Sequence, residues 1–139
     1  MKPIPDTQDS LVLRTDFSDE AAWQALRVAI ETPTPDYGYQ AYVEFISDRE
    51  FEGATIEQVV KAVPPGWRHS FLFIVDQRAI TDPEHPILVV DLYDEPGRNF
   101  RVIPGEMWGI ENNLSLANMD WEDFADNVDA DGVFRGFPE

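Results

Sequence analysis

The chain has 139 residues, no cysteine and a formal net charge of −17, from 27 acidic and 10 basic residues. This length suits one domain, and 43% hydrophobic residues suffice for a packed core. The absence of cysteine excludes disulfides, thiolate zinc sites and a cysteine nucleophile. The negative charge argues against anionic partners, namely nucleic acids and anionic lipid surfaces.

The first part of the chain predicts a loose start, a strand and a helix. Two prolines and polar residues in 1–9 predict a loose N-terminal tail, so we expect a single globular domain over 10–137. A β-prone run over 11–13 is followed by Ser18, a candidate N-cap. An apolar stripe at spacings of three and four then predicts a helix to about Glu31.

The middle of the chain predicts three strands and one short helix. Residues 40–46 alternate as in a half-buried strand, and a capping box at 55–58 opens a short helix. The apolar runs 71–75 and 87–90 fit central strands that are covered on both faces. The ten residues between them, 77–86, are marginal for a parallel crossover, so the direction of this pairing stays open.

The last third predicts a returning strand and two helices. A tight turn precedes a strand over 100–103, which we expect to pair antiparallel with the strand before it. Helices follow over about 104–118 and 121–127, and 132–137 is irregular or a short edge strand. The order β-α-β-α-β-β-β-α-α predicts a single-domain α/β (or α+β) fold, a mixed sheet of about five strands with helices on both faces.

Three acidic residues follow predicted strands: Asp16, Asp76 and Asp91. Ligands of open α/β sheets sit beyond the carboxyl ends of the strands, and Mg²⁺ prefers oxygen ligands. If these carboxylates converge, they form a metal or small-molecule site with Arg14 or Arg101 nearby. The alternative is that acids end strands simply to keep the loops soluble.

Two further patterns resemble parts of metal sites. Asn127–Gly132 matches the front half of a calcium loop, but position twelve is Pro138 and Glu139 comes one residue late. The alternative is an Asx-rich turn. The two histidines, His69 and His85, lack zinc-binding spacing, and a surface or capping role is the alternative to a catalytic one.

The predicted helix over 104–118 carries the most distinctive polar pattern. Glu111, Ser115 and Asn118 follow i, i+4, i+7 spacing and so share one edge of a helix. Asn112 and Asn113 lie mid-helix, where asparagine is a poor helix former. A polar surface that binds a ligand or partner is one reason for such a sequence. Buried asparagines that satisfy loop backbone groups are the other.

The last third also combines aromatic and acidic residues. Trp108 and Trp121 are candidate anchors for a partner, and the surrounding acids would steer a basic protein toward them. The alternative is that these aromatic rings are core and the acids form a solvated face. If both tryptophans are buried, they cannot be anchors.

Several segments resemble an uncharacterised bacterial domain-of-unknown-function family. They are residues 11–18, 81–86, 107–120 and 132–135, of which the helix segment is the most distinctive. The resemblance covers most of the chain and implies a small standalone bacterial protein. It implies no activity, substrate or catalytic residue.

These patterns predict a small acidic interaction protein of the immunity, inhibitor or regulatory type, which binds a basic or mixed protein partner. No catalytic motif is present, so an enzyme is not favoured. We expect no nucleic acid or membrane partner, a cytoplasmic location and no cofactor, with Mg²⁺ or Ca²⁺ left open. The alternative function is the small-molecule or Mg²⁺ site at the strand ends. A mimic of DNA would need the acids in a regular surface stripe, and they are scattered. The oligomeric state stays open.

Overall fold

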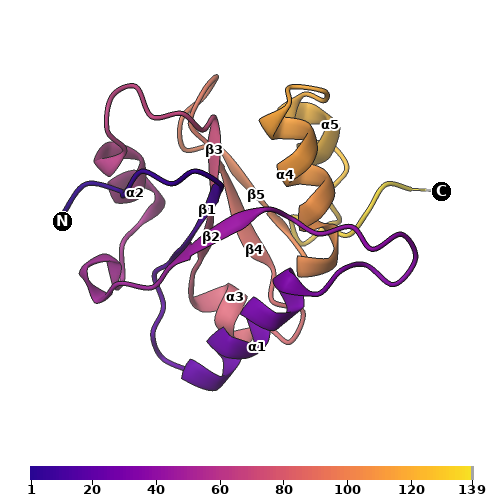
Figure 1. Ribbon diagram of the computed structural model, residues 1–139, viewed down its shortest axis with the longest axis horizontal. Coiled ribbons are helices and arrows are strands. Elements are labelled where there is room, and N and C mark those ends of the chain that lie inside the picture. The colour runs from indigo at the N-terminus through magenta and orange to yellow at the C-terminus, as the bar shows by residue number, and fades with distance from the viewer. Residues whose placement is uncertain (139) are drawn as a thin grey trace.

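A computed structural model describes residues 1–138 (Figure 1). In chain order the elements are β1 (Ser10–Arg14), α1 (Glu20–Glu31), β2 (Val43–Ile46), a 3₁₀ turn (Arg49–Phe51), α2 (Ile56–Ala62), β3 (Phe71–Val75), α3 (Gln77–Thr81), β4 (Ile87–Asp91), β5 (Asn99–Val102), a second 3₁₀ turn (Pro104–Glu106), α4 (Met107–Ser115), α5 (Trp121–Ala125) and β6 (Val133–Phe134). None of the helices within these residues is long and apolar enough to cross a membrane.

The strands of the described chain form one six-stranded sheet in the order β2-β1-β3-β4-β5-β6. β1 pairs parallel with β2 and β3, and β5 pairs parallel with β6, whereas β4 is antiparallel to both its neighbours. The pairing that the sequence left open is therefore antiparallel. The sheet is mixed, as predicted, and the sixth strand is the two-residue edge strand β6.

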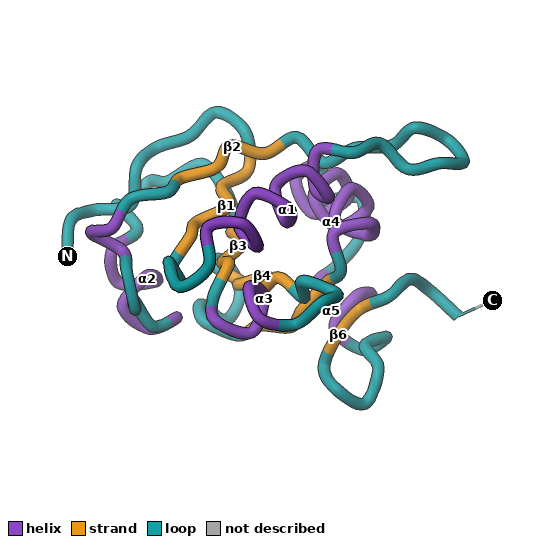
Figure 2. The backbone as a smooth tube through the Cα atoms, turned by 90° about the horizontal axis from the view of Figure 1, so that it is seen from below, coloured by secondary structure: helices purple, strands orange, loops and turns teal. Residues whose placement is uncertain are grey.

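Helices cover both faces of the sheet, as the sequence predicts. Successive residues of a strand point to opposite faces. Phe71 and Phe73 of β3 therefore join the core beneath α1, α3, α4 and α5, whereas Leu72 and Ile74 join the core beneath α2. Figure 2 shows α2 on one side of the strands and α1, α4 and α5 on the other. The candidate surface described below belongs to the α4 side.

Several element boundaries differ from the predicted ones. Asp19 rather than Ser18 caps α1, because the Asp19 carboxylate accepts the Ala22 N–H. The predicted helix over 104–118 begins as a 3₁₀ turn and its α-helical part ends at Ser115. A one-turn helix, α3, occupies the segment before β4 and was not predicted. Its five residues are too few to show a helical period.

The N-terminal segment 1–9 is anchored to the domain rather than loose. Ile4 is 1% exposed and packs in the core on the α2 side of the sheet. Its backbone N–H donates to the Ala62 carbonyl at 2.8 Å. A single isoleucine between two prolines carries no periodic pattern, so its burial depends on a tertiary contact that the local sequence does not encode.

Candidate functional site

The three strand-end acids do not converge on one site. Asp76 follows the end of β3, whereas Asp91 pairs with Phe71 at the start of that strand. The length of β3, about 13 Å at ~3.3 Å per residue, therefore separates these two acids. Asp16 lies at the same edge as Asp76, because β1 and β3 are parallel. A cation shared by all three needs ligand distances of about 2.0–2.6 Å, so the predicted magnesium site is wrong.

Asp76 has a structural role that occupies both its oxygens. Its carboxylate accepts two parallel hydrogen bonds from Arg101, at 2.9 and 2.7 Å. One oxygen also accepts the Ala79 N–H and so caps α3. Arg101 in turn donates to the Pro86 carbonyl. The pair ties β5 to the end of β3 and the start of β4.

Asp91 holds together the loop that follows β4. Its carboxylate accepts the Tyr93 and Glu95 N–H groups and the Nε of Arg98, the last at 2.6 Å. Burial pushes the pKa of Asp91 upward, but these three donors outweigh it and lower the pKa below its ordinary value. The ionised carboxylate of Asp91 therefore has its hydrogen-bond donors and its counter-charge within the chain.

The acids of the loop that resembles half a calcium site are paired with an arginine. Arg135 donates to Asp129 at 2.8 Å and to Asp131 at 2.7 Å, and it also pairs with Glu84. These hydrogen bonds from Arg135 lower the pKa of Asp131 to about 2. Among residues 1–138, no three histidine, aspartate or glutamate side chains cluster to hold a metal ion.

The two histidines are engaged with separate backbone groups. The Nε2 atom of His69 lies 2.7 Å from the Thr7 carbonyl, and its ring packs edge-on against Trp67. The Nδ1 atom of His85 lies 2.8 Å from the Ala79 carbonyl. Both contacts fit the capping alternative.

Glu111, which the helix pattern offered as a partner contact, is a buried structural residue. It is 6% exposed. Its carboxylate accepts the Tyr42 N–H at 2.9 Å and the hydroxyls of Ser10 and Ser115 at 3.2 and 2.9 Å. It thereby fixes the segment before β2 against α4. The predicted direct contact of Glu111 with a partner is therefore wrong, because the side chain is buried and both carboxylate oxygens accept hydrogen bonds within the chain.

The three asparagines have different surroundings. Asn113 is half-buried: its side-chain Nδ2 donates to the Gly109 carbonyl, and its own carbonyl accepts the Asn118 N–H. This is a structural role at the end of the helix. Asn112 and Asn118 are exposed, and Asn118 lies beyond the end of α4. Asn112 is the one of the three that lies exposed on α4 itself.

The two candidate tryptophan anchors differ in burial. Trp121 is 8% exposed and packs edge-on against Phe100, with the Arg98 guanidinium 5.0 Å from its ring. It belongs to the core, so its role as an exposed anchor is wrong. Trp108 is partly exposed and lies 4.4 Å from the ring of Tyr39.

Trp108 is part of an aromatic surface that the sequence patterns did not predict. Tyr37 stacks on Tyr39 at 5.5 Å, and Tyr39 lies on Trp108. Tyr42 is joined through its backbone to α4, and Asn112 lies one helical turn after Trp108. We call these five residues the α4 aromatic surface. The segment that carries the tyrosines projects beside α4 in Figure 1.

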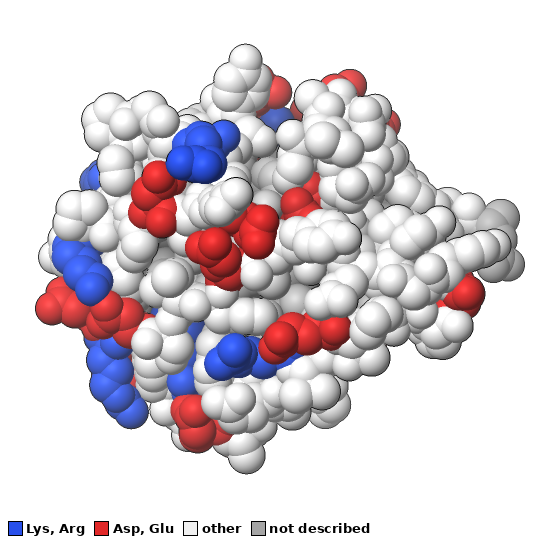
Figure 3. Space-filling model, viewed as in Figure 1, with Lys and Arg blue, Asp and Glu red and all other residues white. Residues whose placement is uncertain are grey.

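The α4 aromatic surface is exposed and carries few charges. Tyr37 is 75% and Tyr42 is 71% exposed. In Figure 3 the part of the molecule over α4 and segment 32–42 is mostly uncharged, with isolated acidic side chains. The sequence signal that could have found this surface is the presence of three tyrosines within 37–42, a segment that follows Pro33 and Pro35 and contains Gly38.

Two acids lie beside this surface without a basic partner. Burial, and secondarily the charge of Asp36, raise the pKa of Glu106 above its ordinary value. Within the described residues 1–138, neither Asp36 nor Glu106 forms an ion pair. In contrast, Asp76 and Asp91 are each paired with an arginine of the same chain.

A family model described as "Domain of unknown function (DUF6924)" matches residues 9–137. The match covers nearly the whole chain and confirms the resemblance to a domain-of-unknown-function family. No curated protein matches the chain.

Proposed function

Because the chain belongs to the DUF6924 family, whose description names no activity, we propose its function from the geometry of the α4 aromatic surface. The protein is a non-enzymatic interaction protein that binds a basic segment of another protein at this surface. The observation that carries the proposal is the exposed stack of Tyr37, Tyr39 and Trp108. Its class is that of an immunity, inhibitor or regulatory protein in the bacterial cytoplasm.

The residue types support a protein partner. Tyrosine and tryptophan are enriched in protein interfaces, because they offer large apolar area together with a polar edge. They also dominate the residues whose loss weakens binding most. Large aromatic side chains left in water, as Tyr37 and Tyr42 are here, gain free energy when a partner covers them.

The charges favour a basic partner. The protein carries a net charge of −17, and Asp36 and Glu106 beside the aromatic surface have no ion pair within the described residues 1–138. An arginine or lysine of a partner can stack on an aromatic face and approach these carboxylates in the same movement. Long-range attraction would also raise the rate of encounter.

The tyrosine segment is held in place before any partner arrives. The Thr34 N–H donates to the Tyr39 carbonyl, and the Tyr39 N–H donates to the Thr34 hydroxyl, both at 2.9 Å. Gly38 closes the turn with a φ of 70°, which other residues rarely adopt. A surface that is already ordered loses less conformational entropy on binding.

The test begins with affinity capture from the native host at low salt, followed by purification of the captured protein and a titration of the binary complex. The variant is Tyr39→Ala/Trp108→Ala, and the matched control is Tyr93→Ala, which removes an exposed tyrosine from another part of the surface. We expect the double variant to weaken binding by about 30-fold or more, and the control to bind as the wild type does.

Salt provides the second reading of the same titration. Raising the ionic strength from about 0.05 M to about 0.5 M shortens the range of electrostatic attraction, so we expect affinity and association rate to fall. A captured partner that binds the double variant as tightly as the wild type contradicts the proposed surface. Affinity that is unchanged by salt contradicts a basic partner.

A further inference from the structure

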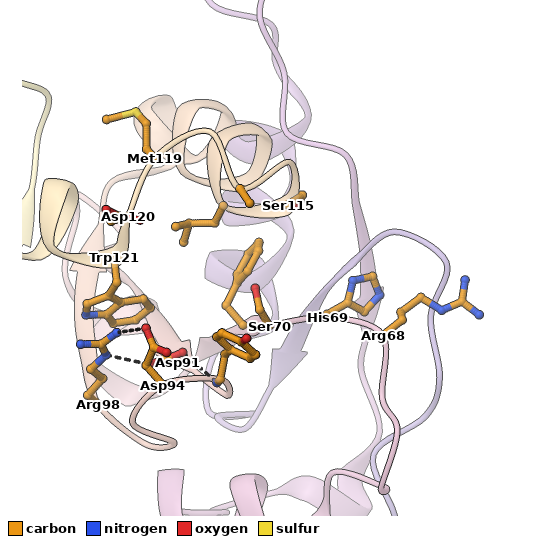
Figure 4. A pocket seen from close by; sticks show the side chains of 14 residues that line it. Arg68, His69, Ser70, Asp91, Asp94, Arg98, Ser115, Met119, Asp120 and Trp121 are labelled. Atoms are coloured by element: carbon orange, nitrogen blue, oxygen red, sulfur yellow. Dashed lines mark hydrogen bonds and ion pairs between the residues drawn. The ribbon is translucent and has the colours of Figure 1, made fainter.

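A cavity of about 450 Å³ lies near the α4 aromatic surface, at the edge of the sheet where β3 begins and β4 ends. Three loops meet around it: the one before β3, the one after β4 and the one between α4 and α5. Figure 4 shows the side chains of Trp121, Ser70 and Asp91 around the same space. Its volume falls in the range of small-molecule sites, about 300–1,000 Å³.

Polar and apolar residues share the walls of the cavity, and the lining includes the aromatic side chains of Phe71, Tyr93 and Trp121. Phe71 and Trp121 are buried, Leu114 is half-buried, and Tyr93 at the rim is 77% exposed. A flat ring that enters this space would exchange water for contact with apolar and aromatic groups on more than one side. The aromatic side chains in the walls thus favour a planar aromatic ligand.

The basic groups of the cavity are already matched by acids. Arg98 pairs with Asp91, Asp94, Glu95 and Glu122, two of which line the cavity with it. Figure 4 shows Arg98 joined to Asp91 and Asp94 by dashed lines. An anionic ligand would have to displace one of these carboxylates, and it would enter a protein of net charge −17. A negatively charged group is therefore disfavoured.

Arg68, the other arginine at the rim, is paired with Asp6 at 3.2 Å. In the described part of the chain, the hydroxyls of Ser70 and Tyr93 have no side-chain partner, although both residues line the cavity. Hydroxyls both donate and accept, so they suit a hydroxyl, amine or amide on the ligand.

The loops around the cavity are fixed by the fold. The Asp91 carboxylate accepts two backbone N–H groups of its own loop, and the Leu92 N–H donates to the Ser70 carbonyl at 2.8 Å. Ala117, at the turn after α4, has a left-handed φ of 54°. Such a conformation costs a non-glycine residue free energy and is common at ligand sites. The cavity is thus present before a ligand arrives.

We propose that this cavity binds a small planar aromatic molecule that carries no negative charge. The proposal does not depend on the proposed function, because none of the residues that define the α4 aromatic surface lines the cavity.

The test uses three probes with one ring system: naphthylmethylamine, naphthylmethanol and naphthoate. Each is titrated into the isotope-labelled full chain and followed through the backbone amide resonances. We expect the amine and the alcohol to shift the resonances of Ser70, Leu92 and Leu114 saturably, and naphthoate to bind at least about tenfold more weakly. The absence of saturable shifts at these residues with all three probes would overturn the proposal. Equal binding of naphthoate would overturn its charge requirement.

Two variants locate the site. Tyr93→Ala removes an exposed rim ring without disturbing the core, and we expect it to weaken the amine about fivefold. Ser70→Phe fills the cavity and should abolish binding. The matched control is Tyr42→Ala, which removes an exposed tyrosine from the α4 aromatic surface and should leave probe binding unchanged. If Tyr42→Ala weakens the probe and Tyr93→Ala does not, the ligand binds elsewhere and the proposal is wrong.

Discussion

Trp121 and Trp108 lie on neighbouring helices over the same face of the sheet, yet their surroundings are opposite. Trp121 packs on Phe100 under the guanidinium of Arg98, which four acids hold in place. Trp108 is only partly covered, by the ring of Tyr39. The acids that surround Arg98 are paired with it, whereas Asp36 and Glu106 beside the α4 aromatic surface form no ion pair within the described residues 1–138.

This difference shows where to look for function in an acidic protein. Some carboxylates that the sequence predicted as metal ligands, such as Asp76 and Asp129, form ion pairs with arginines of the same chain. They stabilise the fold and are not available to an external cation. Aromatic rings and acids that lack internal partners are the groups on which a partner can act.

The largest expected effect separates the two tryptophans directly. Trp121→Ala leaves a cavity in the core and should lower the free energy of unfolding by about 3–5 kcal/mol. Trp108→Ala loses a partly exposed ring and one aromatic contact, so we expect about 1 kcal/mol. Urea unfolding of both variants measures the difference. Equal losses would place Trp108 in the core and remove it from the proposed surface.

The second test removes Arg98, the cation that pairs with the acids around Trp121. Arg98→Met leaves Asp91 buried without its guanidinium, and we expect a loss of about 2–3 kcal/mol in the free energy of unfolding. The control is Arg68→Met, which breaks the exposed pair with Asp6 and should cost less than about 1 kcal/mol.

The pH dependence of the same variant has a defined sign. The pKa of Asp91 is lowered in the folded protein, so its contribution to stability is present above the ordinary carboxyl range of about 3.9 and is lost as the pH falls through the folded pKa. Arg98→Met should therefore flatten the loss of stability of the wild type below about pH 4. If Arg98→Met loses stability below about pH 4 as steeply as the wild type does, other carboxylates cause this loss.

The third test concerns Glu111, which the helix pattern grouped with the surface. Glu111→Ala leaves the Tyr42 N–H and two hydroxyls without their acceptor, and we expect a loss of about 2 kcal/mol in the free energy of unfolding. Glu111→Gln keeps one oxygen acceptor and should cost less. Unchanged stability in Glu111→Ala, together with weakened partner binding, would return Glu111 to the binding surface.

The smallest expected change in stability concerns Glu106, the partly buried acid beside the α4 aromatic surface. The pKa of Glu106 is raised by burial and by Asp36, so ionised Glu106 costs stability, and the cost grows as the pH rises through its folded pKa. Glu106→Gln should therefore be more stable than the wild type near about pH 7, with the difference closing toward about pH 4. The control, Asp126→Asn, changes an exposed acid elsewhere. Its difference in stability from the wild type should not depend on pH in this way.

Most of the fold could be predicted from local patterns. The apolar runs at β3 and β4 and the stripe of α1 each carry their own period. The direction of the β3–β4 pairing could not be predicted, because the ten-residue connection fits neither geometry cleanly. The burial of Ile4 could not be predicted either, since it depends on contacts with the α2 side of the sheet.

The candidate site was only partly predictable. Trp108 and Asn112 were named from the helix that carries them, but nothing local distinguishes Trp108 from Trp121. Each lies in the first turn of a helix, and packing against the sheet decides which ring is covered. Tyr37 and Tyr39 could not be predicted because they lie in a segment without regular structure, where no period marks an exposed face. Tyr42 fell within the strand predicted over 40–46, but β2 begins only at Val43.

Hydrogen exchange of the binary complex would locate the surface that the partner covers. If a basic partner covers the α4 aromatic surface, binding should slow amide exchange in segments 36–42 and 106–112. The loop 91–98, whose acids pair with Arg98, should exchange as it does in the free protein. Slowed exchange confined to 91–98 or to the α2 side of the sheet, with 36–42 unchanged, would show that the partner binds elsewhere and that the α4 aromatic surface is not its binding site.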